Sequence, residues 1–262
     1  MKVVILAGGK GTRLAEETQL RPKPMVEVGG MPLLWHIMKI YSQIEVDEFI
    51  ICLGHKGEVI KRFFLDYHAL RADLSIDLAS GEVRSMGSRA EQWKVTLVET
   101  GTETMTAGRL RRVLPRLAGE RFCLTYGDGL ADVDLAAELS FHERSGRLAT
   151  VLAVRPAPRF GALDLDADGG VRSFQEKPLH ESGVVNGGFF VLEPEVERYL
   201  TGGDTMAFEA TPLQRLAAEG ELAAFRHDGF WQPCDTLRDL RRLEDLWESG
   251  NAPWKVWSDD TP

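Results

Sequence analysis

Short runs of apolar residues alternate along the chain with longer segments in which apolar residues recur every three or four positions. The short runs predict strands at 3–7, 49–53, 74–78, 121–126, 150–154 and 187–192. The longer segments predict helices with one buried face at 34–44, 59–67, 135–144 and 236–247. Strands that alternate with amphipathic helices are typical of βαβ units, so the chain predicts an α/β fold with a mostly parallel sheet.

The pattern changes in the second half of the chain. Residues 161–174 alternate apolar and polar positions around a turn at 166–170, which predicts a hairpin. Three aspartates and a glycine within 164–169 copy the opening of an EF-hand calcium loop, but Gln175 stands where that loop needs a glutamate. We therefore expect a polar hairpin tip at this place and not a calcium site.

Composition narrows the class of protein. The 262 residues include 31 Lys and Arg against 40 Asp and Glu, a formal net charge of −9 that does not favour a nucleic-acid partner. No apolar run reaches the roughly 18 to 20 residues of a membrane helix, and the first run is too short for a signal peptide, so we expect a cytoplasmic protein without a membrane partner. No internal repeat or composition break divides the chain, so we expect one domain over 1–262, frayed at 258–262.

The cysteines do not suggest a disulfide framework or a metal site. Cys52, Cys123 and Cys234 are odd in number and far apart in the sequence. We expect them to fill the hydrophobic core.

A glycine-rich loop follows the first predicted strand directly. It reads Gly8-Gly9-Lys10-Gly11-Thr12-Arg13-Leu14. Glycines let the backbone approach a ligand closely while its amides point at phosphate oxygens, so the loop predicts a phosphate site. No Gly-Lys-Ser/Thr follows as in a Walker loop, and Leu14 replaces the third glycine of the dinucleotide fingerprint. A tight turn without a ligand is the alternative.

A lysine on a stiff backbone comes next. Pro22 and Pro24 fix their own φ angles, and Pro24 also favours an extended conformation at Lys23. A cation held in this way beside a phosphate loop can stabilise charge during phosphoryl or nucleotidyl transfer. The alternative is a proline-rich surface turn with a solvated lysine.

A carboxylate follows the predicted strand at 121–126. Asp128 stands between two glycines at the carboxyl end of that strand, where ligands of open α/β folds bind. Mg²⁺ takes few protein carboxylates and completes its shell with water and substrate phosphates. Asp128 therefore predicts a Mg²⁺ site that needs a second carboxylate from another part of the chain.

The glycine-rich stretch 6–14 and Pro22-Lys23-Pro24 together resemble the signature of the sugar-1-phosphate nucleotidyltransferases. Further segments that resemble this family are 31–38, 126–129, 159–163, 173–178, 186–191, 230–233 and 252–255. The resemblance implies the nucleotide-diphospho-sugar transferase fold. This fold is a Rossmann-like three-layer α/β/α sandwich around a mixed, mostly parallel sheet, with a small hairpin extension that binds the sugar.

The resemblance also implies roles for individual residues. Arg13 and Lys23 would be catalytic, and Asp235 would join Asp128 on the metal; Thr236 with Asp239 fits a capping box that leaves Asp235 free. The implied nucleotide-binding residues are Leu6, Ala7, Gly8, Gly9, Lys10, Gly11, Thr12, Arg13, Thr104, Arg109 and Asp128. The implied sugar-phosphate residues are Gly161, Glu176, Lys177 and Asn186. The nucleotide half would cover 1–130 and the sugar half 131–257.

The activity implied by the resemblance is the Mg²⁺-dependent reaction of CTP with α-D-glucose 1-phosphate, which gives CDP-glucose and pyrophosphate. The segment 100–110 favours CTP, although Ala107 replaces the glycine expected there. UTP, dTTP, another sugar 1-phosphate, and a nucleotide-sugar-binding regulator without turnover are the alternatives. The family also implies a homo-oligomer and bacterial deoxysugar synthesis for polysaccharide, and the segment 80–93 would serve as an interface arm or a lid.

Overall fold

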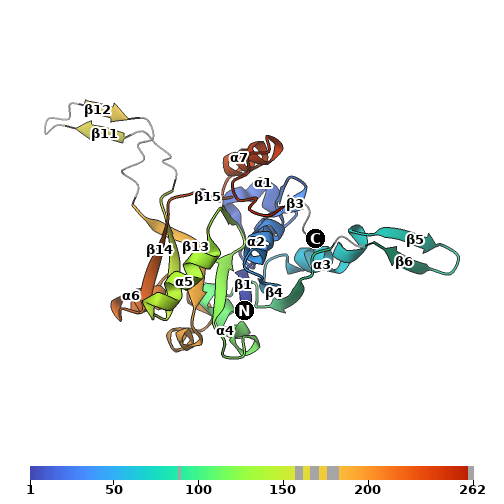
Figure 1. Ribbon diagram of the computed structural model, residues 1–262, viewed down its shortest axis with the longest axis horizontal. Helices are drawn as coiled ribbons and strands as arrows, with labels where there is room; N and C mark the ends of the chain where they lie inside the picture. The colour runs from blue at the N-terminus through green and yellow to red at the C-terminus, as the bar shows by residue number, and fades with distance from the viewer. Residues whose placement is uncertain (88–89, 157–161, 166–170, 176–182, 259–262) are drawn as a thin grey trace.

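A seven-stranded sheet forms the centre of the protein (Figure 1). Its strands follow the spatial order β14-β10-β13-β8-β1-β4-β7. The computed structural model describes residues 1–87, 90–156, 162–165, 171–175 and 183–258. The sheet contains β1 (Lys2–Leu6), β4 (Glu48–Leu53), β7 (Lys94–Glu99), β8 (Phe122–Tyr126), β10 (Ala149–Val154), β13 (Val185–Leu192) and β14 (Leu222–His227).

Most neighbouring strands of this sheet run parallel. β8, β1, β4 and β7 are parallel to one another, and β10 is parallel to β14. β13 is antiparallel to both of its neighbours, β10 and β8. The mixed, mostly parallel sheet expected from the sequence is confirmed.

Helices cover both faces of the sheet. They are α1 (Ala15–Thr18), α2 (Leu33–Ser42), α3 (Gly57–Leu70), α4 (Thr106–Val113), α5 (Leu135–Ser145), α6 (Thr211–Ala218) and α7 (Leu237–Glu248). One buried cluster joins Val3 and Ile5 of β1 to α2, α3, α5 and α7, and a second joins Val4 and Leu6 to α4 and α6. Because successive side chains of a strand point to opposite faces, these clusters lie on opposite sides of the sheet, and the three-layer sandwich is confirmed.

Smaller elements connect these layers. The 3-10 turns are η1 (Thr12–Leu14), η2 (Lys23–Met25), η3 (Leu114–Arg116), η4 (Pro194–Tyr199) and η5 (Gly203–Thr205). The short strand pairs are β2 (Glu27–Val28) with β3 (Met31–Pro32), and β9 (Gly129–Ala131) with β15 (Trp231–Pro233). The second pair brings two distant parts of the chain together just beyond the end of β8.

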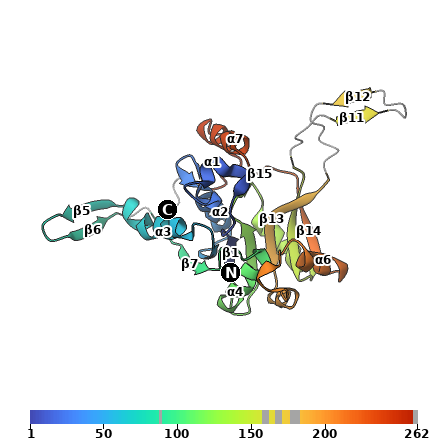
Figure 2. The same cartoon turned by 180° about the vertical axis from the view of Figure 1, so that it is seen from behind.

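A separate hairpin projects from the body beyond α3 (Figures 1 and 2). β5 (Asp73–Asp77) pairs antiparallel with β6 (Glu82–Met86), and every residue of both strands is exposed. The strand predicted at 74–78 is confirmed as β5, but it lies outside the main sheet. Polar and apolar residues alternate along β5, so only one of its faces is apolar and it does not suit a strand buried on both sides.

The hairpin predicted at 161–174 is confirmed where the structure describes it. β11 (Ala162–Leu165) pairs antiparallel with β12 (Val171–Gln175), and the turn at 166–170 lies outside the described residues.

The three cysteines are buried and none forms a disulfide, as expected for core residues. Within the described ranges, no helix has both the length and the apolar character needed to cross a bilayer.

Glu138 of α5 is a buried acid. Glu138 is 1% exposed, and its Oε1 has no hydrogen-bond partner among the described residues. Burial disfavours the charged form and raises the pKa of Glu138 to about 8. Glu138 is therefore mostly protonated in the folded protein at neutral pH.

Replacing Glu138 with Gln should weaken the pH dependence of folding stability. The folded protein holds the Glu138 proton up to a pKa of about 8, whereas the ordinary pKa is 4.5. The stability that this group contributes is complete below pH 4.5 and is lost as the pH rises to about 8, at up to about 1.4 kcal/mol per pH unit. Urea unfolding of both proteins across this range measures the difference, and curves of equal slope would contradict the prediction.

Candidate active site

A cleft of about 800 Å³ opens where β1 and β8 end. β1 lies between β4 and β8, so the order of the strands along the chain reverses at β1. Open α/β folds bind ligands at such a reversal point. The lining of the cleft comes from the glycine loop after β1, from residues 102–106 and Arg109, from the end of β8, and from β13 and β15. The volume is sufficient for a cofactor-sized ligand.

The glycine loop forms one wall of this cleft. Residues 8–13 all line it, together with Leu6 and Ala7. Gly11 has a φ of +64°, and a Cβ there would lie 2.9 Å from Thr18 Cγ2. At Gly8, a Cβ would lie 2.1 Å from Arg109 Nη1. Gly11 therefore requires glycine for its backbone conformation, and a side chain at position 8 would have to displace the Arg109 guanidinium.

Arg109 of α4 fastens this loop to the body. Its guanidinium donates hydrogen bonds to Gly8 O at 2.9 Å, Leu53 O at 2.9 Å and Thr100 Oγ1 at 2.7 Å. Arg109 is 4% exposed, and burial lowers its pKa from the ordinary value. The structure places both Arg109 and the buried Thr104 in the lining of the cleft.

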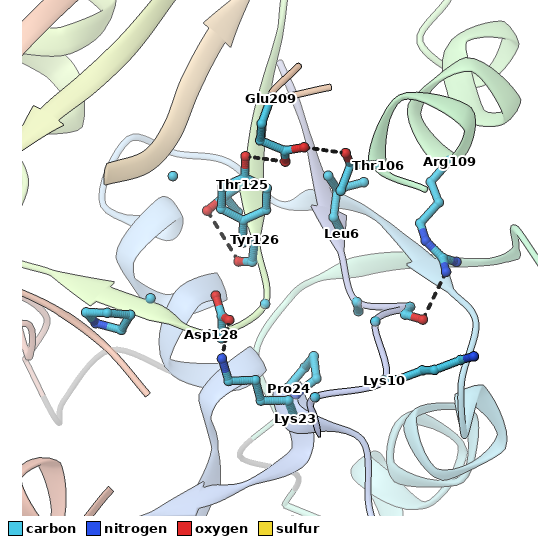
Figure 3. A pocket seen from close by; sticks show the side chains of 18 of the residues that line it. Leu6, Lys10, Lys23, Pro24, Thr106, Arg109, Thr125, Tyr126, Asp128 and Glu209 are labelled. Atoms are coloured by element: carbon cyan, nitrogen blue, oxygen red, sulfur yellow. Dashed lines mark hydrogen bonds and ion pairs between the residues drawn. The ribbon is translucent and has the colours of Figure 1, made fainter. Parts of the chain in front are cut away.

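Lys23 lies between two carboxylates. Lys23 Nζ is 2.6 Å from Asp128 Oδ2 and 2.5 Å from Asp235 Oδ1 (Figure 3 shows its contact with Asp128). Arg13 Nη1 reaches the other oxygen of Asp235, Oδ2, at 2.7 Å. Burial lowers the pKa of Lys23, but the two carboxylates outweigh this effect and raise its pKa above the ordinary value. Lys23 is therefore a cation at neutral pH.

The pairing of β9 with β15 brings the two carboxylates together. Gly129, which follows Asp128, pairs with Pro233, and Cys234 N donates a hydrogen bond to Asp128 O at 2.9 Å. The predicted capping box of α7 is confirmed, because Thr236 and Asp239 cap each other. The Asp235 carboxylate is consequently free for Lys23 and Arg13.

The chemistry of this donor set fits Mg²⁺. Asp128 and Asp235 already share one cation, the Lys23 ammonium, so their oxygens converge on a position that favours positive charge. Mg²⁺ needs few protein carboxylates when water and phosphate oxygens fill its other positions. Within the described part of the chain, no group of three or more His, Cys, Asp or Glu side chains forms a complete metal site.

The cleft also contains polar residues that the sequence did not indicate. Tyr126 Oη donates to Glu209 Oε1 at 2.5 Å, and Thr106 Oγ1 donates to Glu209 Oε2 at 2.6 Å (Figure 3). Burial and the neighbouring Glu209 carboxylate raise the pKa of Tyr126 far above its ordinary value. Tyr126 stands next to the Gly127-Asp128 signal, but Glu209 follows no recognisable motif.

A further ion pair, more exposed than those of Lys23, lies at the cleft. Lys10 Nζ of the glycine loop is 2.8 Å from Glu103 Oε1, and both side chains are largely exposed. The exposure means that the pair contributes little to stability. A polyphosphate entering the cleft can therefore displace Glu103 from Lys10 at low cost.

One expected sugar-phosphate residue lies in the cleft. Asn186 lines it at the start of β13, and its Oδ1 accepts a hydrogen bond from Gly188 N at 2.8 Å. Gly161, Glu176 and Lys177 lie outside the described residues.

Comparisons with known proteins show what this chain is similar to. The model of the nucleotidyl transferase family matches residues 2–250. The chain is 54% identical to the glucose-1-phosphate cytidylyltransferases of Salmonella typhi and Salmonella typhimurium, over 98% of this chain and 100% of each relative. A solved UDP-glucose pyrophosphorylase complexed with UDP-glucose superposes with a TM-score of 0.69 at 15% identity, covering 95% of this chain and 98% of that one. This last likeness shows the fold.

Replacing Lys23 with Met should make folding stability depend on Mg²⁺. The change leaves Asp128 and Asp235 without their shared ammonium, which should lower the free energy of unfolding by about 3 kcal/mol at pH 7 without a divalent cation. Mg²⁺ should then bind the carboxylates and restore part of the loss, whereas the wild-type protein should respond weakly. Thermal unfolding with and without Mg²⁺ measures both effects.

Lys61→Met is the matched control, because Lys61 pairs with Glu99 on the surface and does not line the cleft. Equal responses of the Lys23 variant and the wild-type protein to Mg²⁺ would show that Lys23 does not occupy the place of the metal.

Proposed function

This chain belongs to the nucleotidyl transferase family, and we propose that it transfers the cytidylyl group of CTP to α-D-glucose 1-phosphate, giving CDP-glucose and pyrophosphate. The observation that carries the reaction type is the Lys23, Asp128 and Asp235 cluster beside a glycine loop in one cleft. The 54% identity to glucose-1-phosphate cytidylyltransferases supports the choice of CTP and glucose 1-phosphate.

The reaction needs no protein nucleophile. An oxygen of the sugar phosphate attacks the α-phosphorus of CTP in line, and pyrophosphate leaves. The attacking group is already ionised at neutral pH, so the protein has to align two anions and offset their repulsion. Asp128 and Asp235 would hold Mg²⁺, which would neutralise part of the phosphate charge.

The residues of the chain divide this work among them. Backbone amides of the glycine loop, with Thr12 and Arg13, hold the pyrophosphate that leaves. Lys23 stabilises the charge that develops around the α-phosphate. Thr104 and Arg109 contact the nucleotide, and Arg109 also fixes the loop through its bond to Gly8 O. The sugar phosphate lies against Asn186 and the residues Gly161, Glu176 and Lys177.

Pyrophosphate release from the purified protein tests the proposal. With Mg²⁺ and glucose 1-phosphate, CTP should support rapid release, and UTP, dTTP, ATP and GTP should support much less. Chromatography should identify the other product as CDP-glucose. Release with a different nucleotide would keep the reaction type and overturn the choice of base, and release only with another sugar 1-phosphate would overturn the choice of sugar.

The Asp235→Ala variant should lower kcat with CTP roughly 100-fold, because one group that stabilises phosphate charge is lost. Lys61→Ala, on the surface away from the cleft, should leave kcat within about twofold. If CDP-glucose thermally stabilises the wild-type protein but none of the five nucleotides supports pyrophosphate release, the protein is a binding regulator without turnover.

We also propose that the protein is a homo-oligomer, and that the β5–β6 hairpin forms part of the interface. In its register Ile76 lies opposite Val83 and Leu74 opposite Ser85, so the side chains of Leu74, Ile76 and Val83 share one face. Ile76 is 53% exposed and Val83 58% exposed. An isolated two-stranded hairpin is at best marginally stable in water, so a second copy of the chain would complete its packing. Among the described residues, none of this hairpin lines the cleft, which argues against a lid.

Replacing both Ile76 and Val83 with Ser should shift the protein to a smaller assembly. Light scattering after gel filtration should give the wild-type protein a mass above the 29.2 kDa of one chain. Arg84→Ser, on the opposite face of the hairpin, is the matched control and should leave the mass unchanged. A wild-type protein that elutes at the mass of one chain would overturn the proposal.

A further inference from the structure

Glu209 differs from the other carboxylates that line the cleft. Lys23 and Arg13 pair with Asp128 and Asp235, and Lys10 pairs with Glu103. Glu209 has no ion pair with any side chain in the described ranges. Among the carboxylates of the described residues that line the cleft, Glu209 is therefore the one without an ion pair.

Two hydroxyl groups from different elements hold this carboxylate in place. Tyr126 at the end of β8 donates to Oε1, and Thr106 at the start of α4 donates to Oε2. Thr106 Oγ1 in turn accepts a hydrogen bond from Phe208 N at 2.7 Å, and Phe208 is fully buried. The residue before Glu209 is thus anchored in the core, while Glu209 itself is exposed to the cleft. Each oxygen keeps a further lone pair for a ligand.

The surroundings of Glu209 indicate which part of a ligand it meets. Asn186 Nδ2 lies 3.5 Å from Tyr126 Oη, so Glu209 and Asn186 flank the same tyrosine. Arg109 contacts the glycine loop at Gly8, and Figure 3 shows it apart from Glu209. A fixed negative charge repels phosphate and accepts hydrogen bonds from neutral donors. The place beside Asn186 therefore suits hydroxyl groups of a sugar ring.

We propose that Glu209 is a specificity-determining residue that accepts hydrogen bonds from hydroxyl groups of the sugar in the nucleotide sugar. Tyr126 and Thr106 act as positioning residues, because they hold its two oxygens. The inference rests on the proposed function for the identity of the ligand, and it adds a residue on the sugar side of the cleft. The same charge disfavours a sugar phosphate that carries a ring carboxylate.

Calorimetric titration with CDP and with CDP-glucose separates the sugar from the rest of the ligand. Glu209→Gln should weaken the binding of CDP-glucose roughly tenfold, as expected for the loss of one hydrogen bond to a charged acceptor. Its binding of CDP should stay within about twofold of the wild-type protein, which also shows that the variant is folded. In steady-state assays, the KM for glucose 1-phosphate should rise by a similar factor while the KM for CTP stays constant.

Two further variants complete the experiment. Tyr126→Phe keeps the charge of Glu209 but removes one positioning hydroxyl, so it should weaken CDP-glucose binding less than Glu209→Gln does. Glu195→Gln removes the same charge from an exposed surface outside the cleft and should have no effect.

The outcomes distinguish this inference from the proposed function. Equal weakening of CDP and CDP-glucose by Glu209→Gln would place the residue near the nucleotide and overturn the inference. Unchanged binding of both ligands would overturn it as well. Failure of the wild-type protein to bind CDP-glucose would instead overturn the proposed function on which the inference depends.

Discussion

The cleft depends on the balance between one buried ammonium and two carboxylates. Lys23 is 9% exposed and Asp235 10% exposed, so either charge would be strongly unfavourable without the other. Pro22 and Pro24 hold the Lys23 backbone, and the β9–β15 pairing brings Asp128 and Asp235 together. Both are needed for the three charged groups to meet at one point. Because the ammonium offsets the charge of the carboxylates, the chain can fold before any ligand binds. The carboxylates still present oxygens suited to a divalent cation.

The layers of the fold could be predicted from the sequence because they rest on strong hydrophobic patterns. Strands buried on both faces, such as β4, are continuous apolar runs. Weaker patterns were missed: β7 is half-buried and alternates polar with apolar residues, and α4 contains three arginines within eight residues. Their places depend on partners elsewhere in the chain, so no local signal determines them.

The residues of the site also divide into those that the sequence indicates and those that it does not. Gly8, Lys23 and Asp128 follow local signals in the sequence, whereas Asp235 is indicated by the family resemblance. The structure brings all four into one cleft. Glu209 has no such signal, because its position follows from the burial of Phe208 and from hydroxyl groups on β8 and α4. A residue placed by tertiary contacts alone cannot be found by reading along the chain.

The packing of Arg109 against Gly8 sets limits for protein engineering. A Cβ at position 8 or at Gly54 would overlap the guanidinium, at 2.1 Å and 2.5 Å from Nη1. At Gly54 a Cβ would also lie 2.6 Å from the backbone oxygen of Gly8. These three positions therefore form one packed unit, in which a side chain at either glycine has to displace the guanidinium. Selection for a different nucleotide preference should therefore keep them constant and vary Thr104 and Met105, which line the same cleft. Glu103 and Thr106 are less suitable, because the first pairs with Lys10 of the loop and the second holds Glu209.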